Sequence, residues 1–350
     1  MTRTHPHNSW YALAASDEVG RDPLGRRALD TGVVLFRTTD GAAVALEDRC
    51  VHRPYPLSRG WLDGDTIVSG YSGFTYDARG FCVRVPTQDE IPVGARVRGF
   101  PVHDDGVFVW VWLGEPSLAA LRTPPVLGWL DEPGWVTVGD TWETAADLAL
   151  LHENFADITH VAVVDPFIAP PVLRNSPPPL EVEVTETTVA FSRTYAKAPI
   201  AAWQAELAGL DPDASHVQRE RGMFASPGVW VDSWDVEVEG GTPPVLTFRF
   251  THAVTPIAAG RTRHAWRVSR NFALGEQASK VLVPIFTEYY RRVQSILETM
   301  QQVIDSDGPR REVNVSADAA ALQVRKIIRS MVADETGTPV RRGPRAAQRR

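Results

Sequence analysis

Two groups of residues in this chain have types and spacings that suit chemistry. The first is a Cys-x-His pair, Cys50 and His52, and thiolate and imidazole are side chains that bind transition metals. The other cysteine, Cys82, offers a third ligand, but a structural zinc site normally has four. A buried thiol beside a surface imidazole also explains such a pair, so both interpretations stay open here.

The second group consists of Glu153, Asn154, Asp157 and His160. On a helix with about 100° per residue, Glu153, Asp157 and His160 fall within roughly 60° of one another, with Asn154 beside them. A carboxylate next to an imidazole raises the pKa of the histidine and fixes its tautomer. We therefore take His160 as the first candidate catalytic residue and Asp157 as its orienting partner. The alternative is a structural His–Asp pair.

Two kinds of element must position these groups. Residues 8–118 contain short β-branched runs separated by Gly, Pro and Asp, which predicts hairpins in a small all-β domain spanning residues 1–118. A linker rich in Pro and Gly follows at 119–135. Residues 136–333 predict a second domain with long strands at 180–195, 229–237, 245–255 and 262–273.

Helices are expected at three places in the second domain. The first is 144–160, with Thr144 as N-cap and Asp147 at the third helical position. The others are 287–305, where apolar residues recur at three- and four-residue steps, and 316–331, with Ser316 as N-cap. Together these patterns predict an α+β fold in which a long helix covers one face of a curved antiparallel sheet.

The stretch from Cys50 to Asp77 resembles the Rieske domain of Rieske-type non-heme iron oxygenases. That family has the pattern C-x-H and, further on, C-x-x-H-G. The matching positions here are Cys50, His52, Arg53, Pro56, Leu57, Ser58, Gly73, Phe74, Tyr76 and Asp77. Where the family has its second Cys and His, this chain has Ser69 and Ser72. A Rieske [2Fe-2S] centre needs two thiolates and two imidazoles, so we expect this domain to fold without a cluster.

The resemblance extends to the second domain, which in this family has a helix-grip (START-like) form. The family's helix carries N-x-x-D-x-x-H, matched by Asn154, Asp157 and His160. Asp165 stands where the family has its second iron-binding His, and Val293 stands where the terminal helix has its carboxylate. Of the 2-His-1-carboxylate triad only His160 is kept. We therefore expect no cofactor, with mononuclear iron as the alternative.

The whole chain sets further limits. The 350 residues carry a formal net charge of −7, which argues against a nucleic-acid partner. No apolar run is long enough for a membrane span and no signal segment is evident, so we expect a cytoplasmic protein without a membrane partner. Two cysteines agree with a reducing compartment. The Arg-rich segment 334–350 is expected to be a disordered tail.

Three functions follow from these observations. The leading hypothesis is a metal-independent, non-redox enzyme that cyclises, eliminates, isomerises or hydrolyses a small hydrophobic or aromatic specialised metabolite. In it His160 moves the proton, Asp157 orients it and Asp165 is a possible second acid, with Asn154 and Glu153 beside them. The alternatives are a non-catalytic subunit that assembles with an intact oxygenase paralogue, and a residual mononuclear iron oxygenase. Because the family forms head-to-tail trimers, the resemblance implies a homotrimer or a hetero-oligomer with an oxygenase paralogue.

Overall fold

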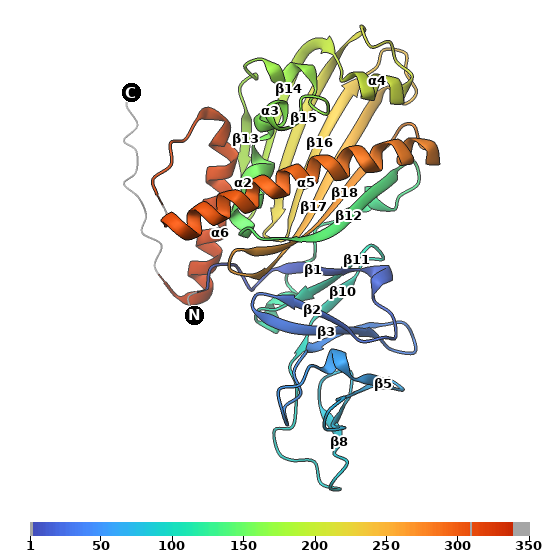
Figure 1. The fold of residues 1–350 in the computed structure, drawn as a ribbon, viewed down its shortest axis with the longest axis vertical. Coiled ribbons are helices and arrows are strands. Elements are labelled where there is room, and N and C mark those ends of the chain that lie inside the picture. The colour runs from blue at the N-terminus through green and yellow to red at the C-terminus, as the bar shows by residue number, and fades with distance from the viewer. Residues whose placement is uncertain (1–2, 309, 339–350) are drawn as a thin grey trace.

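The computed structural model describes residues 3–308 and 310–338, which form an N-terminal β domain and a larger domain of sheet and helices (Figure 1). The predicted α+β class and the all-β nature of the first part are confirmed. Within the described residues, no helix is both long and apolar enough to cross a membrane. The Arg-rich residues from position 339 onward lie outside the described part of the chain.

The N-terminal domain is built from three small sheets in the strand orders β2-β3-β4-β9, β1-β11-β10 and β5-β6-β7-β8. The strands are β1 Trp10–Ala15, β2 Leu24–Ala28, β3 Thr31–Arg37, β4 Ala43–Glu47, β5 Trp61–Asp63, β6 Thr66–Val68, β7 Thr75–Tyr76, β8 Cys82–Arg84, β9 Gly99–Phe100, β10 Val102–Asp104 and β11 Phe108–Trp112. Strands β5 to β8 form the end of the domain that lies farthest from the large sheet (Figure 1). Cys50 precedes these strands and shares an apolar cluster with their residues Ile67, Tyr76 and Cys82.

Strand β11, with the sequence FVWVW, is buried on both faces. Side chains alternate across a strand, so Val109 and Val111 pack into the core of the N-terminal domain while Trp110 and Trp112 face the other way. There they share a core with Val229 of the second domain. This shared core joins the two domains, and the Leu29 N–H strengthens the junction by donating to the Pro256 carbonyl over 2.7 Å.

The second domain contains one antiparallel sheet with the order β12-β18-β17-β16-β15-β14-β13. Its strands are β12 Val136–Thr144, β13 Glu181–Val184, β14 Val189–Pro199, β15 Ser215–Ser226, β16 Val229–Glu237, β17 Val245–Ala258 and β18 Arg261–Arg270. The predicted strands at 229–237, 245–255 and 262–273 are present. The predicted strand at 180–195 is a hairpin of two strands, and β12 and β15 were not predicted.

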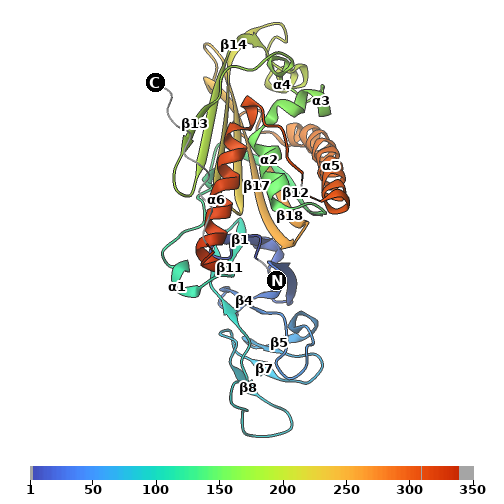
Figure 2. The same cartoon turned by 90° about the vertical axis from the view of Figure 1, so that its left-hand side faces the viewer.

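Helices α2 Leu148–Ala156, α5 Glu276–Asp307 and α6 Ala319–Thr336 pack on this sheet and share one apolar core with it. Figure 2 shows α2 between the sheet and α5, and α5 crosses the strands in Figure 1. The shorter helices are α1 Pro116–Ala119, α3 Val161–Val164, α4 Ala202–Ala208, η1 Ser16–Glu18, η2 Leu57–Arg59, η3 Gly128–Leu130, η4 Ile158–His160, η5 Pro171–Arg174 and η6 Ser316–Asp318.

Three helix predictions need correction at their ends. Thr144 does not cap a helix, because it pairs with Thr262 in the sheet; Asp147 is the N-cap of α2 instead. Helix α2 ends at Ala156, so it does not reach His160. The terminal helix α5 begins at Glu276 rather than at residue 287 and continues through Pro284.

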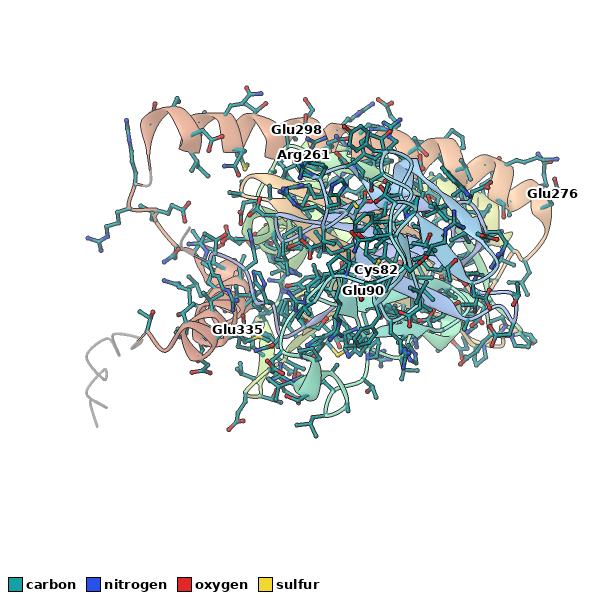
Figure 3. All side chains as sticks on the ribbon, turned by 90° about the horizontal axis from the view of Figure 1, so that it is seen from below. Cys82, Glu90, Arg261, Glu276, Glu298 and Glu335 are labelled. Atoms are coloured by element: carbon teal, nitrogen blue, oxygen red, sulfur yellow. The ribbon has the colours of Figure 1, made fainter. Side chains whose placement is uncertain are left out.

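Helix α6 also differs from its prediction, because its N-cap residue is Asp318 rather than Ser316 and it ends at Thr336 instead of residue 331. Residues 334–336, which we expected to belong to a disordered tail, are therefore helical. Near the end of α6, Glu335 accepts hydrogen bonds from the backbone N–H groups of His7 and Asn8 at 2.8 and 2.7 Å. Seen from below, Glu335 lies on the opposite side of the molecule from Glu276 and Glu298 of α5 (Figure 3). The C-terminal helix therefore holds the N-terminal segment in place.

Candidate active site

A largely apolar cavity of about 110 Å³ lies between the sheet, α5 and the segment that follows α2. The largest group of lining residues is aromatic: Phe155, Trp203, Trp234, Phe248, Phe250, Phe286, Tyr289 and Tyr290. A smaller number of polar side chains also line it: Asn154, His160, Gln204, Glu220, Asp232, Ser233 and His252. An apolar pocket with a few convergent polar groups is the usual form of a small-molecule site.

His160 is held in this wall by contacts to both ring nitrogens. Its Nδ1 lies 2.6 Å from the backbone carbonyl oxygen of Asp157, so Nδ1 carries the proton and donates it. Its Nε2 then accepts from the Asn154 amide at 3.1 Å and from the Tyr289 hydroxyl at 3.4 Å. Burial lowers the pKa of His160, although the bond to Asp157 opposes that shift. The neutral imidazole is therefore the favoured form at neutral pH, with Nε2 as the proton acceptor.

Asp157 does not meet His160 through its carboxylate, as the helix geometry had predicted. The chain leaves α2 at this residue, and the carboxylate caps η4 by accepting from the Thr159 N–H and hydroxyl, both at 2.9 Å. The predicted orienting contact is instead made by the Asp157 backbone carbonyl. Asn154, which we had placed beside His160, does contact it.

Glu153 and Asp165 lie outside the cavity lining. Glu153 forms a two-pronged ion pair with Arg325 of α6, with a distance of 2.6 Å from its Oε2 to Nη2. Asp165 accepts from the backbone N–H groups of Phe167 and Ile168 and lies 3.3 Å from Arg292. The ion-pair partners Arg325 and Arg292 come from distant parts of the chain, which explains why local spacing did not reveal them.

Several polar cavity residues were not singled out from the sequence. Asp232 lies between Trp230 and Trp234 on the same face of β16, so the alternation of that strand was a usable signal. Burial raises the pKa of Asp232 well above its ordinary value. A 2.7 Å hydrogen bond from the Trp230 indole lowers the pKa but does not cancel this effect. Burial also raises the pKa of Glu220, which the unpredicted strand β15 supplies.

His252 of β17 and His264 of β18 form a buried pair with 3.0 Å between Nδ1 and Nε2. Burial lowers the pKa of His252 to about 3 and that of His264 well below its usual value. The ring of His252 stacks on Phe155, with 4.0 Å between centroids. Both imidazoles are therefore neutral at physiological pH. Of the two, only His252 reaches the cavity.

In the N-terminal domain, the Cys50 thiol is buried in a small hydroxyl cluster. Its Sγ lies 3.2 Å from the Tyr76 hydroxyl and 3.5 Å from the Ser72 hydroxyl, and Ser72 donates to Ser69 over 3.5 Å. Burial raises the pKa of Cys50, but the hydrogen bonds from Tyr76, Ser72 and Ser69 outweigh it and leave the pKa below the usual value. His52 is exposed and stacks on Phe74 at 4.9 Å.

Comparison with known proteins places both domains. Residues 144–334 match the model of the vanillate O-demethylase oxygenase C-terminal domain, and residues 9–101 match that of the Rieske [2Fe-2S] domain. The chain belongs to the Rieske-type non-heme iron oxygenase family. The resemblance inferred from the Cys50 stretch is thereby confirmed.

Relatives in this Rieske oxygenase family span nearly the full chain. The toluene-4-sulfonate monooxygenase system iron-sulfur subunit TsaM1 of Comamonas testosteroni is 27% identical, over 94% of this chain and 98% of its own length. The vanillate O-demethylase oxygenase subunit of a Pseudomonas species is 28% identical, over 94% and 96%. Dicamba monooxygenase bound to dicamba has a TM-score of 0.85 at 26% identity, over 95% of this chain and 98% of that structure.

The expectation that this chain has no cofactor is wrong for a chain of this family. The matched N-terminal model is that of a [2Fe-2S] domain, and TsaM1 is described as an iron-sulfur subunit. A further structure of dicamba monooxygenase contains non-heme iron; it has a TM-score of 0.81 at 26% identity, over 96% of this chain and 100% of that one. Iron is thus the cofactor to which the family points.

The side chains at the Rieske positions of this chain nevertheless do not fit a [2Fe-2S] centre. Cys50, His52, Ser69 and Ser72 supply one thiol, one imidazole and two hydroxyls. The centre takes two thiolates on one iron and two imidazoles on the other. No step of the function below is therefore assigned to a cluster.

The mononuclear iron positions do not fit either. Asp165 is engaged with Arg292 and two backbone N–H groups, and Val293 is buried in the apolar core. Among residues 3–308 and 310–338, no group of three or more His, Cys, Asp or Glu side chains lies close enough together to hold a metal ion. The 2-His-1-carboxylate set that binds ferrous iron is not supplied here. What the cavity does supply is an oriented imidazole.

Proposed function

We propose that this chain is an enzyme that binds a small hydrophobic or aromatic molecule in the cavity and transfers a proton on it through His160. One observation carries this proposal: Nδ1 of His160 donates a hydrogen bond to the Asp157 carbonyl, which leaves Nε2 as the basic nitrogen. Nε2 contacts Asn154 and Tyr289, which both line the cavity. A fixed tautomer with its lone pair at a substrate pocket is the arrangement that a general base requires.

The volume and lining of the cavity support a one-ring aromatic substrate. Its volume of about 110 Å³ approaches that of cavities of about 150 Å³ that bind benzene. Aromatic side chains are the largest group among its lining residues and include Trp203 and Phe286, whose ring centroids lie 6.0 Å apart. The names of the relatives also point to one-ring aromatic substrates, namely toluene-4-sulfonate, vanillate and dicamba.

Each neighbour of His160 has a part in the proposed reaction. The Asp157 carbonyl stabilises the imidazolium that forms when Nε2 takes a proton, because Nδ1–H remains its donor. Burial raises the pKa of Tyr289, so its hydroxyl stays protonated and can donate to a substrate oxygen or back to Nε2. Such a pair serves a cyclisation, elimination, isomerisation or hydrolysis, which are the non-redox reactions that we propose for this site.

A surface feature supports the proposal that the chain assembles into an oligomer. The end of the N-terminal domain exposes large apolar side chains, including Trp61 at 54% and Tyr71 at 68%. Exposed aromatic residues in one region are typical of a protein–protein contact. We propose a homotrimer or a hetero-oligomer with an oxygenase paralogue. Light scattering on the purified chain, alone and with such a paralogue, distinguishes the two.

Exchange of an acidic C–H with solvent deuterium tests the proton transfer. One-ring ketones such as acetophenone and phenylpyruvate serve as probes, and NMR follows the loss of their α-hydrogens in deuterium oxide. We expect the wild type to accelerate exchange and His160→Ala to slow it about 100-fold or more, the usual contribution of a general base. The matched control is Glu153→Gln. Glu153 is next to Asn154 in the chain but does not line the cavity, and it pairs with Arg325. Equal exchange rates for the wild type and His160→Ala would remove the role of His160.

A further inference from the structure

Two buried polar side chains in the cavity wall each have an atom without a partner. Glu220 of β15 and Gln204 of α4 are both 2% exposed, and both line the cavity that contains His160. Within the described residues, Oε1 of Glu220 and Nε2 of Gln204 have no hydrogen-bond partner. Buried polar atoms are nearly always paired, so two unpaired atoms in the wall of one cavity indicate a missing polar partner.

Glu220 has its other oxygen fully engaged. Its Oε2 accepts from the Tyr195 hydroxyl at 2.7 Å and from Arg193 at 3.3 Å, and both side chains of the ion pair are 3% exposed. Burial is the largest influence and raises the pKa of Glu220, whereas the contacts with Tyr195 and Arg193 favour the ionised carboxylate. The charge of Arg193 is thereby balanced inside the protein. Only the acceptor Oε1 remains for a ligand.

Gln204 contributes the complementary group. It lies on α4, a helix of Ala202–Ala208, beside the cavity residue Trp203. An amide NH₂ group is a donor only, whereas a carboxylate oxygen is an acceptor only. A ligand group that satisfies both atoms must therefore accept one hydrogen bond and donate another, which a hydroxyl group does with its single oxygen.

We propose that Gln204 and Glu220 form a polar subsite that recognises a neutral hydroxyl group on the substrate. The hydroxyl oxygen accepts from Nε2 of Gln204, and the hydroxyl hydrogen is donated to Oε1 of Glu220. This assignment rests on the proposed function, because it specifies the small aromatic substrate of that cavity as a phenol or a related alcohol. An anionic carboxylate is disfavoured at this place, because it would face the Glu220 carboxylate while Arg193 is already neutralised.

Calorimetric titration with phenol, toluene and benzoate tests the subsite. Phenol and toluene have nearly the same size, so their difference in affinity reports the hydroxyl group. We expect phenol to bind the wild type about tenfold more tightly than toluene, as one hydrogen bond to a charged group provides. We expect benzoate to bind more weakly than phenol. Val161→Phe, which fills part of the same cavity, should weaken all binding.

Two variants locate the preference. Gln204→Leu removes an amide nitrogen that has no partner, so it should fold normally while losing the preference for phenol over toluene. Glu220→Gln should lose the preference as well, but it leaves Arg193 buried and unpaired, so Gln204→Leu remains decisive if that variant does not fold. A matched control is Ser192→Ala, whose hydroxyl contacts Glu181 on the exposed side of β14.

The outcomes separate the subsite from the proposed function. Toluene or benzoate binding the wild type as tightly as phenol overturns the subsite alone, as does an intact preference in Gln204→Leu or unchanged phenol binding in Val161→Phe. Failure of all three probes to bind overturns the aromatic cavity on which the proposed function depends. Loss of the preference in Gln204→Leu, with Ser192→Ala unchanged, supports the subsite.

Discussion

Asp165 lies 3.3 Å from Arg292, and its carboxylate also accepts from the N–H groups of Phe167 and Ile168. This carboxylate therefore fixes the segment after α3 against the long helix α5. The same segment places Ile168 and Leu173 in the wall of the cavity. The residue that we had considered as a second acid thus has a structural function in the cavity wall.

Replacement of Asp165 should show whether this residue is a catalytic acid or has a structural function. Asp165→Ala leaves two N–H groups without an acceptor, so we expect the free energy of unfolding to fall by about 1–3 kcal/mol and phenol to bind more weakly. Asp165→Asn keeps an acceptor oxygen and should cost less. Chemical denaturation and calorimetric titration measure both effects. If Asp165 were a catalytic acid, the Asn and Ala variants would be equally inactive.

The ion pair between Glu153 and Arg325 joins α2 to α6. We expect Glu153→Gln to lower the free energy of unfolding by about 1 kcal/mol, because a two-pronged, partly buried pair is stronger than an exposed one. Glu288→Gln is the matched control, since Glu288 pairs with Arg292 at an exposed position. Urea denaturation measures the difference, and equal stabilities of the two variants would contradict it.

His152 should make stability depend on pH. It is fully buried, its Nε2 lies 2.9 Å from the Pro227 carbonyl, and burial lowers its pKa to about 4. Between pH 6.5 and about 4 the unfolded chain binds a proton at this residue that the folded chain does not, so stability falls as the pH is lowered through this window. Above pH 6.5 this contribution is constant.

The size of the effect is on the order of 3 kcal/mol for a shift of this extent. His152→Gln keeps a donor for the Pro227 carbonyl but cannot titrate, so its stability should decline less than that of the wild type on acidification. Urea denaturation at pH 7.5 and pH 4.5 gives the comparison. Parallel pH profiles for the two proteins would show that His152 does not titrate on unfolding.

The Cys50 region offers a direct test of the donor set. The double variant Ser69→Cys and Ser72→His supplies the second thiolate and the second imidazole that a Rieske centre takes. We expect it to bind more iron and labile sulfide per chain than the wild type and to gain visible absorption. Elemental analysis and absorption spectroscopy measure the gain. Equal, stoichiometric contents in both proteins would show that two serines are compatible with the cluster.

The sequence predicted some elements closely because their signals are local. Strand β16 was predicted with its observed bounds, Val229–Glu237, because apolar and polar residues alternate there between two turn-forming segments. The start of α5 was missed, since Pro284 suggests a break that this helix does not have. Thr144 was assigned to a helix because its pairing with Thr262 is a long-range contact that no local pattern records.

The same distinction holds for the site. The Asn154–His160 contact was expected from short spacing and is present. The predicted contact of the Asp157 carboxylate with His160 is absent, because α2 ends at Ala156, one residue before Asp157. The partners of Glu153 and Asp165 lie on α6 and α5, far along the chain. Gln204 and Glu220 belong to elements that were not predicted, so their presence in the cavity became visible only in the folded chain.

The tryptophans of β11 have a consequence for how this protein unfolds. Trp110 and Trp112 are fully buried against Val229 and its neighbours in the core that both domains share. Separating the domains would expose these indoles to water, which opposes independent melting of either part. Calorimetry should therefore record a single heat-absorption peak, and a fragment that ends before β12 should expose these rings and self-associate.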